Sequence, residues 1–160
     1  MLTTIIFFCF LLGCVAGLRA FTAPAVVCWG AHFGWLHFAG TSFSFMDHMV
    51  TLVIFTLLAL GELITDKLPK TPARTSPPQL IARILFGGFA GAALSVGAGG
   101  TLVTGALAGM VGAAIGTFVG YHMRHALVTQ VKLPDLPMAV MEDLLAIAGG
   151  LFLASHLVLP

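Results

Sequence analysis

The chain has 160 residues, 59% of them hydrophobic and only 8% charged, with a formal net charge of +1. Because a soluble domain carries about 25% charged residues, this composition excludes an ordinary water-soluble fold and indicates a membrane protein. The near-neutral charge argues against nucleic acid as a partner. We expect one transmembrane domain over residues 1–160, embedded in a lipid bilayer.

Five apolar stretches are long enough to cross a bilayer, whose hydrocarbon core of about 30 Å needs about 20 residues per helix. They cover about residues 2–24, 46–65, 79–97, 101–125 and 137–158. No basic residue precedes the first apolar run, so we interpret it as a retained span rather than a cleaved signal. The predicted fold is all-α and polytopic, with a first hairpin (about 1–66), a middle helix (about 79–97) and a second hairpin (about 101–158).

Residues 24–45, between the first two spans, are apolar and aromatic but interrupted by Pro24 and several glycines. The segment could continue the first helix beyond a kink at Pro24. It could instead be a re-entrant or interfacial segment with Trp29 and Trp35 at the level of the head groups, or a sixth span. The sequence leaves these three interpretations open.

Basic residues predict the orientation. Lys67, Lys70 and Arg74 lie in one connection and Lys132 in another, and with five spans both connections fall on one face. The positive-inside rule makes that face cytoplasmic. The N-terminus would then be cytoplasmic and the C-terminus outside, and a sixth span would reverse only the N-terminus.

Two stretches suggest a duplication: GCVAGLRA in the first span, with Gly13, Gly17 and Arg19, and GTFVGYHMRHAL in the fourth, with Gly116, Gly120 and Arg124. Each precedes an irregular segment containing proline and then a span that begins near an acidic residue. Because one span separates the two hairpins, the second would enter from the opposite side, which is the inverted repeat of many secondary transporters. Coincidence among glycine-rich helices is the alternative.

Glycines recur at four-residue steps and so share helix faces on which backbones can approach closely. The candidate packing residues are Gly13, Gly17, Gly87, Gly91, Gly105, Gly109, Gly112, Gly116 and Gly120. Packing within the molecule is one interpretation; the seam of a homo-oligomer, or contact with another subunit of a membrane complex, is the other.

Ionisable side chains in lipid cost about 2.5–3.5 kcal/mol each, so they usually face a partner or a wet cavity. The residues to explain are Arg19, Asp47, Glu62, Asp66, Arg124, Glu142 and Asp143. We expect Arg19 to pair with Asp47 at the outer face, and Arg124 with Glu142 and Asp143 at the cytoplasmic face. Lys67, Arg83 or Arg124 could neutralise Glu62 and Asp66. The pairs would act as staples that fix helix register, or as gates.

His122 and His125 lie three residues apart and share a helix face, where they could sense pH because imidazole titrates near neutrality. Their spacing is not diagnostic of a metal site, and we expect no metal or other cofactor. The chain has no Walker loop, nucleophile elbow or zincin motif, so an enzyme is the less favoured class.

Three motifs, GLRAF, GELITDKLPKTPART and GYHMRHAL with PDLPMAVMEDLLA, resemble a bacterial membrane-protein family known as a domain of unknown function (number 4126). The matching residues are Gly17, Leu18, Arg19, Ala20, Glu62, Asp66, Lys67, Pro69, His122, Arg124, Glu142 and Asp143. The stretch LPDLPMAVM departs from the family pattern because it has no asparagine. The resemblance implies an integral inner-membrane protein and no known activity.

The functional prediction is a small transporter- or channel-like protein of unknown substrate. The first alternative is a non-catalytic accessory subunit of a larger membrane complex, and the second is a membrane-embedded enzyme that acts on lipids.

Overall fold

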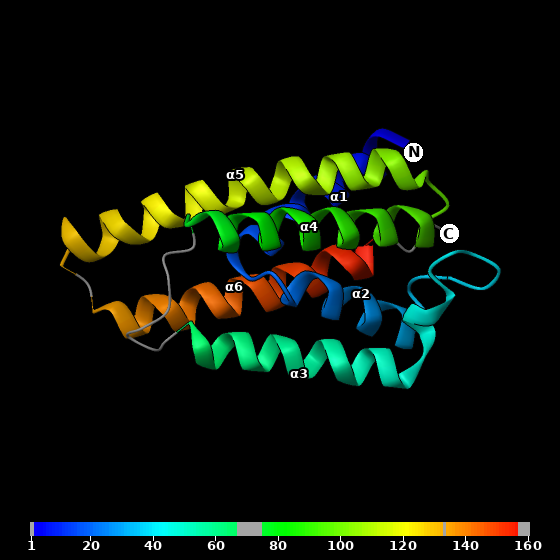
Figure 1. Cartoon of the computed structure of the whole chain (residues 1–160), viewed down its shortest axis with the longest axis horizontal. Coiled ribbons are helices and arrows are strands. Elements are labelled where there is room, and N and C mark those ends of the chain that lie inside the picture. The colour runs from blue at the N-terminus through cyan, green and yellow to red at the C-terminus, as the bar shows by residue number, and fades with distance from the viewer. Residues whose placement is uncertain (1, 67–74, 133, 157–160) are drawn as a thin grey trace.

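The structure is a computed structural model that describes residues 2–66, 75–132 and 134–156. Every regular element in these ranges is a helix: α1 (Leu2–Leu18), α2 (Thr22–His32), the 3₁₀ turn η1 (Ser44–Asp47), α3 (Met49–Thr65), α4 (Pro77–Gly97), α5 (Leu102–Thr129) and α6 (Asp135–His156). The α-helices lie side by side along one long axis (Figure 1). Because α4, α5 and α6 are long and apolar enough to cross a membrane, and α1 and α3 are shorter apolar helices, the fold is that of an all-helical membrane protein.

The chain reverses direction between α1 and α2. Pro24 has no N–H, and its ring would clash with the carbonyl of Ala20 in a continuous helix, so the helix ends before it. The prediction that the first helix continues beyond a kink is therefore wrong, because α2 runs back beside α1 as an 11-residue helix. Consecutive α-helices alternate in direction from there, so Leu2 and His156 lie at the same end of the molecule, not at opposite ends as five spans predict (Figure 1).

The predicted inverted repeat is wrong for the same reason. A Cβ on Gly112 would meet the backbone of Phe10, and one on Gly116 would meet that of Cys14. The contacts advance along both helices together, so α1 and α5 run parallel, whereas an inverted repeat requires them to be antiparallel. The additional reversal at α2 changes the parity on which the prediction rested.

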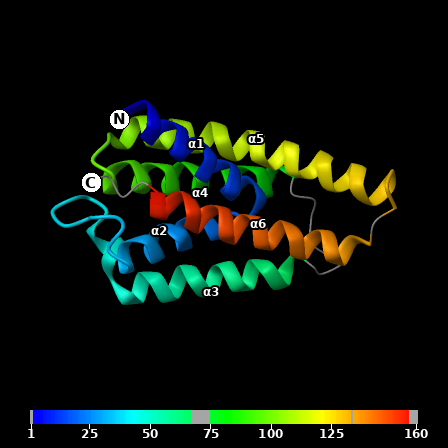
Figure 2. The same ribbon diagram turned by 180° about the vertical axis from the view of Figure 1, so that it is seen from behind.

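Glycine faces join α1, α4 and α5 into one layer (Figure 2). Gly91 of α4 faces Gly105 and Gly109 of α5, and Gly13 of α1 faces Gly109 so closely that an added Cβ would overlap backbone atoms. Of the predicted packing glycines, Gly17, Gly87, Gly112 and Gly116 also lie in these contacts, and Gly120 is half-buried. These faces are therefore used for packing inside the molecule.

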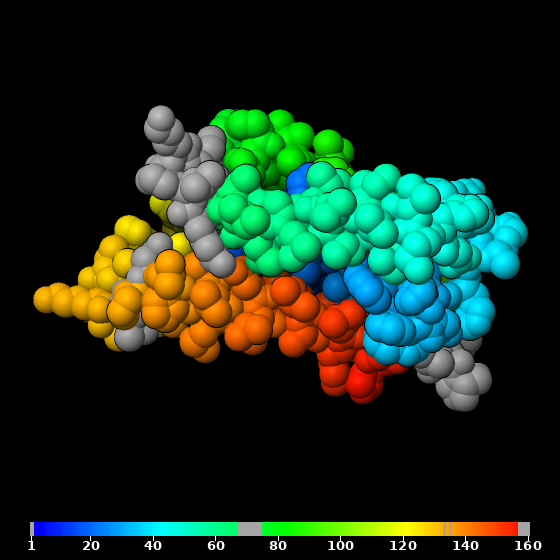
Figure 3. All heavy atoms as spheres, turned by 90° about the horizontal axis from the view of Figure 1, so that it is seen from below, coloured from blue at the N-terminus to red at the C-terminus, as the bar shows by residue number. Residues whose placement is uncertain are grey.

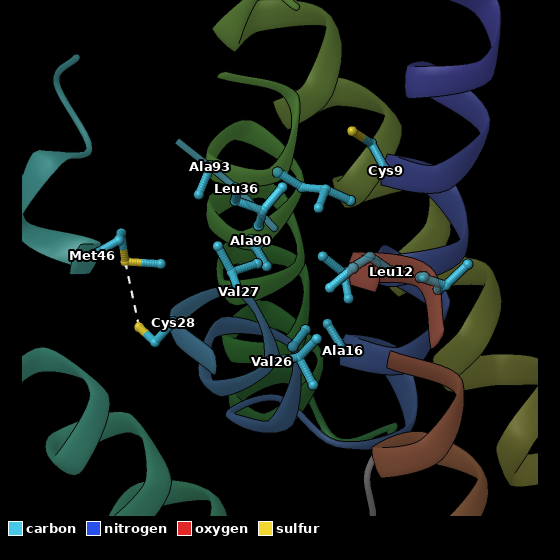
Figure 4. Packing of buried hydrophobic residues seen from close by; sticks show 14 of the residues in the cluster. Cys9, Leu12, Ala16, Val26, Val27, Cys28, Leu36, Met46, Ala90 and Ala93 are labelled. Carbon is cyan, nitrogen blue, oxygen red and sulfur yellow. Dashed lines mark hydrogen bonds between the residues drawn. The ribbon is translucent and has the colours of Figure 1, made fainter. Parts of the chain in front are cut away.

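A second layer consists of α2, α3 and α6, with α2 between the first layer and α3. The core where the layers meet includes Leu12 of α1, Val27 of α2 and Ala90 of α4 (Figure 4). The aromatic stretch between α2 and α3 covers one end of this core, because Leu36 and Phe38 are buried there. The helix break lies at the other end of α2.

Candidate functional site: a buried charged cluster at the helix break

The break between α1 and α2 leaves backbone polar groups that other helices must satisfy, because lipid cannot. Glu62 of α3 accepts hydrogen bonds from the backbone N–H groups of Ala20 (2.7 Å) and Phe21 (2.9 Å). Its carboxylate thus lies at the N-terminus of α2, where the helix dipole favours a negative charge.

The carbonyl groups at the end of α1 are satisfied by two further helices. Arg83 of α4 donates to the carbonyl oxygens of Gly17 (2.9 Å) and Leu18. Thr117 of α5 donates to the same Gly17 oxygen at 3.2 Å. The end of α1 and the start of α2 are therefore held by side chains from α3, α4 and α5.

Arg19 occupies the break itself and is completely buried. It donates from Nη1 to Asp66 Oδ2 at 2.6 Å and from Nη2 to Asp143, which comes from α6. Arg83 Nη2 lies 3.7 Å from Glu62 Oε1 and 3.5 Å from Asp66 Oδ2. We refer to these five residues (Arg19, Glu62, Asp66, Arg83 and Asp143) as the charged cluster.

Burial makes the charged cluster costly to form and costly to disturb. Arg19 and Arg83 are 0% and 1% exposed. Desolvation of such groups costs several kcal/mol per ion, which close opposite charges offset. Arg19 Nε nonetheless has no hydrogen-bond partner among the described residues. A cluster of this kind holds α3, α4 and α6 against the break between α1 and α2, and it can be opened only by separating charges.

The structure brings Arg124 and Glu142 together as expected, but it separates Arg19 from Asp47. The expected pairing of Arg19 with Asp47 is wrong, because Asp47 lies in η1, before α3, and Asp66 follows the other end of that 17-residue helix, about 25 Å away. Arg124 Nη1 lies 3.8 Å from Glu142 Oε2, whereas Asp143 pairs with Arg19. The reversal at α2 explains the error, since it carries Arg19 to the end of the molecule where α3 ends.

Arg83 and Thr117 belong to this site but were not among the predicted site residues. The sequence signal for Arg83 was a lone arginine in an apolar helix, which we considered only as a neutralising partner. Thr117 gave no signal, because threonine is common in membrane helices. Their role depends on the position of the helix break, which periodicity does not reveal.

His122 and His125 are exposed on α5, about 8 and 12 Å past Thr117 along the helix axis. Their neighbour is Tyr121, whose ring stacks on His125 with centroids 6.2 Å apart. This last part of α5 extends about 18 Å past Thr117, at 1.5 Å per residue. Within the described residues, no group of three or more His, Cys, Asp or Glu side chains could hold a metal ion.

An apolar groove of about 330 Å³ lies over α2 between α3 and α6, and we refer to it as the α2 groove. It is visible as a hollow in which α2 appears in blue between α3 and α6 (Figure 3). Its lining comprises Thr22, Ala25, Val26, Trp29, Phe33, Thr56, Ala59, Leu60, Leu63, Ile147 and Leu151. The indole N–H of Trp29 donates to Thr56 Oγ1 at 3.2 Å, so two polar groups of the lining satisfy each other.

The model of the family described as a domain of unknown function (DUF4126) matches residues 6–159, which is nearly the whole chain. The protein therefore belongs to this family. No curated protein and no solved structure matches it.

Proposed function

We propose that this member of the family is a transporter- or channel-like protein of the cytoplasmic membrane, in which the charged cluster is a closed gate. The observation that carries the proposal is the position of the cluster at a helix break. Transporters place their sites at broken helices, where free backbone groups and charged side chains meet inside the membrane. Here Glu62 holds the start of α2 and Arg83 holds the end of α1.

The charge distribution supports an orientation for this gate. The connections that contain Lys67, Lys70 and Arg74, and Lys132, join α3 to α4 and α5 to α6. The alternation of the helices puts both connections at the end of the molecule nearer the charged cluster. By the positive-inside rule this end is cytoplasmic, so the gate would close the cytoplasmic side and both termini would lie outside. Because the helices of one copy pack closely, a wide path would have to form between several copies, so we expect the protein to assemble as an oligomer.

A second candidate function is that of an accessory subunit in a larger membrane complex. The mutual pairing of Arg19, Asp66 and Asp143 favours this function. Charges that neutralise one another can fix the positions of the helices without lining a path for a substrate. The glycine faces do not support it, because they are packed inside the molecule. A lipid-acting enzyme is less favoured, since Glu62 and Asp143 are both engaged by hydrogen-bond donors.

Flux through proteoliposomes tests the gate. Purified protein would be reconstituted with an entrapped pH-sensitive dye, and potassium and chloride conductance would be recorded in planar bilayers. We expect Arg19→Ala to raise at least one flux above wild type, because it releases Asp66 and Asp143. The matched control is Arg124→Ala, which removes an arginine outside the cluster. Unchanged fluxes in a folded Arg19→Ala protein, together with co-purification of wild type in a larger complex, would favour the accessory subunit.

A further inference from the structure

The α2 groove opens on the surface that faces the membrane. Leu60, one of its lining residues, is 50% exposed, and the exposed Leu57 and Leu144 lie three positions before the lining residues Leu60 and Ile147 on their own helices. In a protein of this composition such side chains face lipid, so the groove is continuous with the lipid-facing surface. Its natural occupant therefore comes from the bilayer.

The lining of the groove selects an uncharged, elongated group. Among the described residues, no Asp, Glu, Lys, Arg or His side chain lines it, and the hydroxyl of Thr56 already accepts a hydrogen bond from Trp29. The groove extends along α2, whose 11 residues rise about 16 Å. That length is close to the thickness of one leaflet of a hydrocarbon core of about 30 Å, which fits an acyl chain.

Three residues of the charged cluster lie close in sequence to lining residues at one end of the groove. Arg19 precedes the lining residue Thr22 by three positions, Glu62 adjoins Leu63, and Asp143 precedes Ile147 by four. A residue of the charged cluster thus lies within about one helical turn of the groove lining on each of α2, α3 and α6. At the other end aromatic rings gather: those of Trp29 and Phe33 lie 5.4 Å apart, and those of Phe33 and Trp35 lie 5.0 Å apart. The imidazole of His32 lies edge-on to Trp29, with ring centroids 5.8 Å apart.

We propose that the α2 groove binds one acyl chain of a bilayer phospholipid, with its head group at the end nearer the charged cluster and the end of the chain toward Trp29. The charged cluster agrees with this direction, since its carboxylates and guanidinium groups lie at the end proposed for the head group, whereas the rings of Trp29 and Phe33 lie at the end proposed for the terminal methyl group. The site requires no transport, so it stands whether or not the charged cluster is a gate.

Fluorescence quenching can test the site, because the chain has only two tryptophans, Trp29 and Trp35. The variant Trp35→Phe makes Trp29 the only tryptophan. It would be reconstituted into phosphatidylcholine or phosphatidylglycerol vesicles whose acyl chains carry bromine either near the carboxyl group or near the terminal methyl group. We expect bromine near the terminal methyl group to quench Trp29 more strongly, with both head groups. Stronger quenching by bromine near the carboxyl group would overturn the proposed direction.

A matched pair of substitutions separates the groove from ordinary lipid contact. Ala59→Phe, in the Trp35→Phe background, fills the groove from α3, whereas Ala148→Phe adds the same ring to an exposed position on α6. We expect Ala59→Phe to lose the dependence on bromine position and Ala148→Phe to keep it. The same dependence of quenching on bromine position in both variants would overturn the site. Quenching of Trp29 by a brominated free fatty acid, but not by a brominated phospholipid, would also overturn it. The comparison of bromine positions in Trp35→Phe alone needs no substitution in the groove, so it remains decisive if Ala59→Phe fails to fold.

Discussion

Arg19 and Asp143 form a buried ion pair although they are 124 positions apart in the sequence. Asp66 accepts a hydrogen bond from the other terminal nitrogen of Arg19, so this one side chain joins α1 to α6 and to the end of α3. We expect Arg19→Ala to lower the free energy of unfolding by about 3–5 kcal/mol, because it removes the buried cation that donates hydrogen bonds to the buried Asp143 and the partly buried Asp66. Equilibrium unfolding in mixed micelles of a mild detergent and dodecyl sulfate would measure the loss.

The pair of Arg124 and Glu142 provides the control. Their charged groups are 3.8 Å apart, and the Arg124 side chain is 23% exposed, so solvent screens the interaction. We expect Arg124→Ala to cost about 1 kcal/mol or less. Equal losses of unfolding free energy in Arg19→Ala and Arg124→Ala would show that the charged cluster stabilises the fold no more than a partly exposed ion pair does.

Glu62 is expected to control the start of α2. Glu62→Ala removes the acceptor of two backbone N–H groups, those of Ala20 and Phe21, and each buried donor left unsatisfied costs about 1–3 kcal/mol. Hydrogen exchange at these two amides should therefore become faster. Asp47→Ala, which removes an acid at the opposite end of α3, should leave their exchange unchanged. Slow exchange in Glu62→Ala would mean that another group caps α2.

Helix positions after residue 45 were largely predictable from the sequence. The spans expected at 46–65 and 79–97 became Met49–Thr65 and Pro77–Gly97, because proline, glycine and charged residues bound each apolar run. The reversal after α1 was not predictable, since apolar residues continue on both sides of it. Pro24 indicated a kink or break in the first apolar run, but packing against α4 and α6 decides which way the chain then runs.

The charged residues of the site were predictable one by one, because each is expensive in lipid. Their pairing was not, since it depended on the number of reversals. An error of one reversal moved Arg19 from the end with Asp47 to the end with Asp66. Asp143 was expected beside Arg124, and the geometry of α6 instead turns it toward Arg19 while Glu142 faces Arg124.

The even number of α-helices in the described part of the chain, α1 to α6, predicts that Leu2 and His156 lie on the same side of the membrane. In a cysteine-free background, Thr3→Cys and His156→Cys should react with an impermeant maleimide from one side, and Gln130→Cys from the other. Thr3 precedes the interior part of α1, and His156 ends α6, while Gln130 follows α5 at the far end. Labelling of Thr3→Cys and Gln130→Cys from the same side would restore a five-span topology.

The contact between α4 and α5 is expected to tolerate no side chain at Gly109. A Cβ at this position would overlap the carbonyl group of Gly87, which is backbone and cannot rotate away. We expect Gly109→Ala to lower the free energy of unfolding by about 1–3 kcal/mol, as overpacking does. This loss would appear despite the better helix propensity of alanine, which favours it over glycine by about 1 kcal/mol.

Gly149 of α6 provides the matched substitution, because a Cβ there would meet no atom within 4 Å. Gly149→Ala should therefore show the propensity gain alone and raise the free energy of unfolding by up to about 1 kcal/mol. Opposite signs for the two variants in the same unfolding assay would show that close backbone approach, rather than glycine content, holds α4 against α5. A gain in both would mean that the helices can separate at little cost, and the layer of α1, α4 and α5 would then have to be held chiefly by the side chains around Arg83 and Thr117.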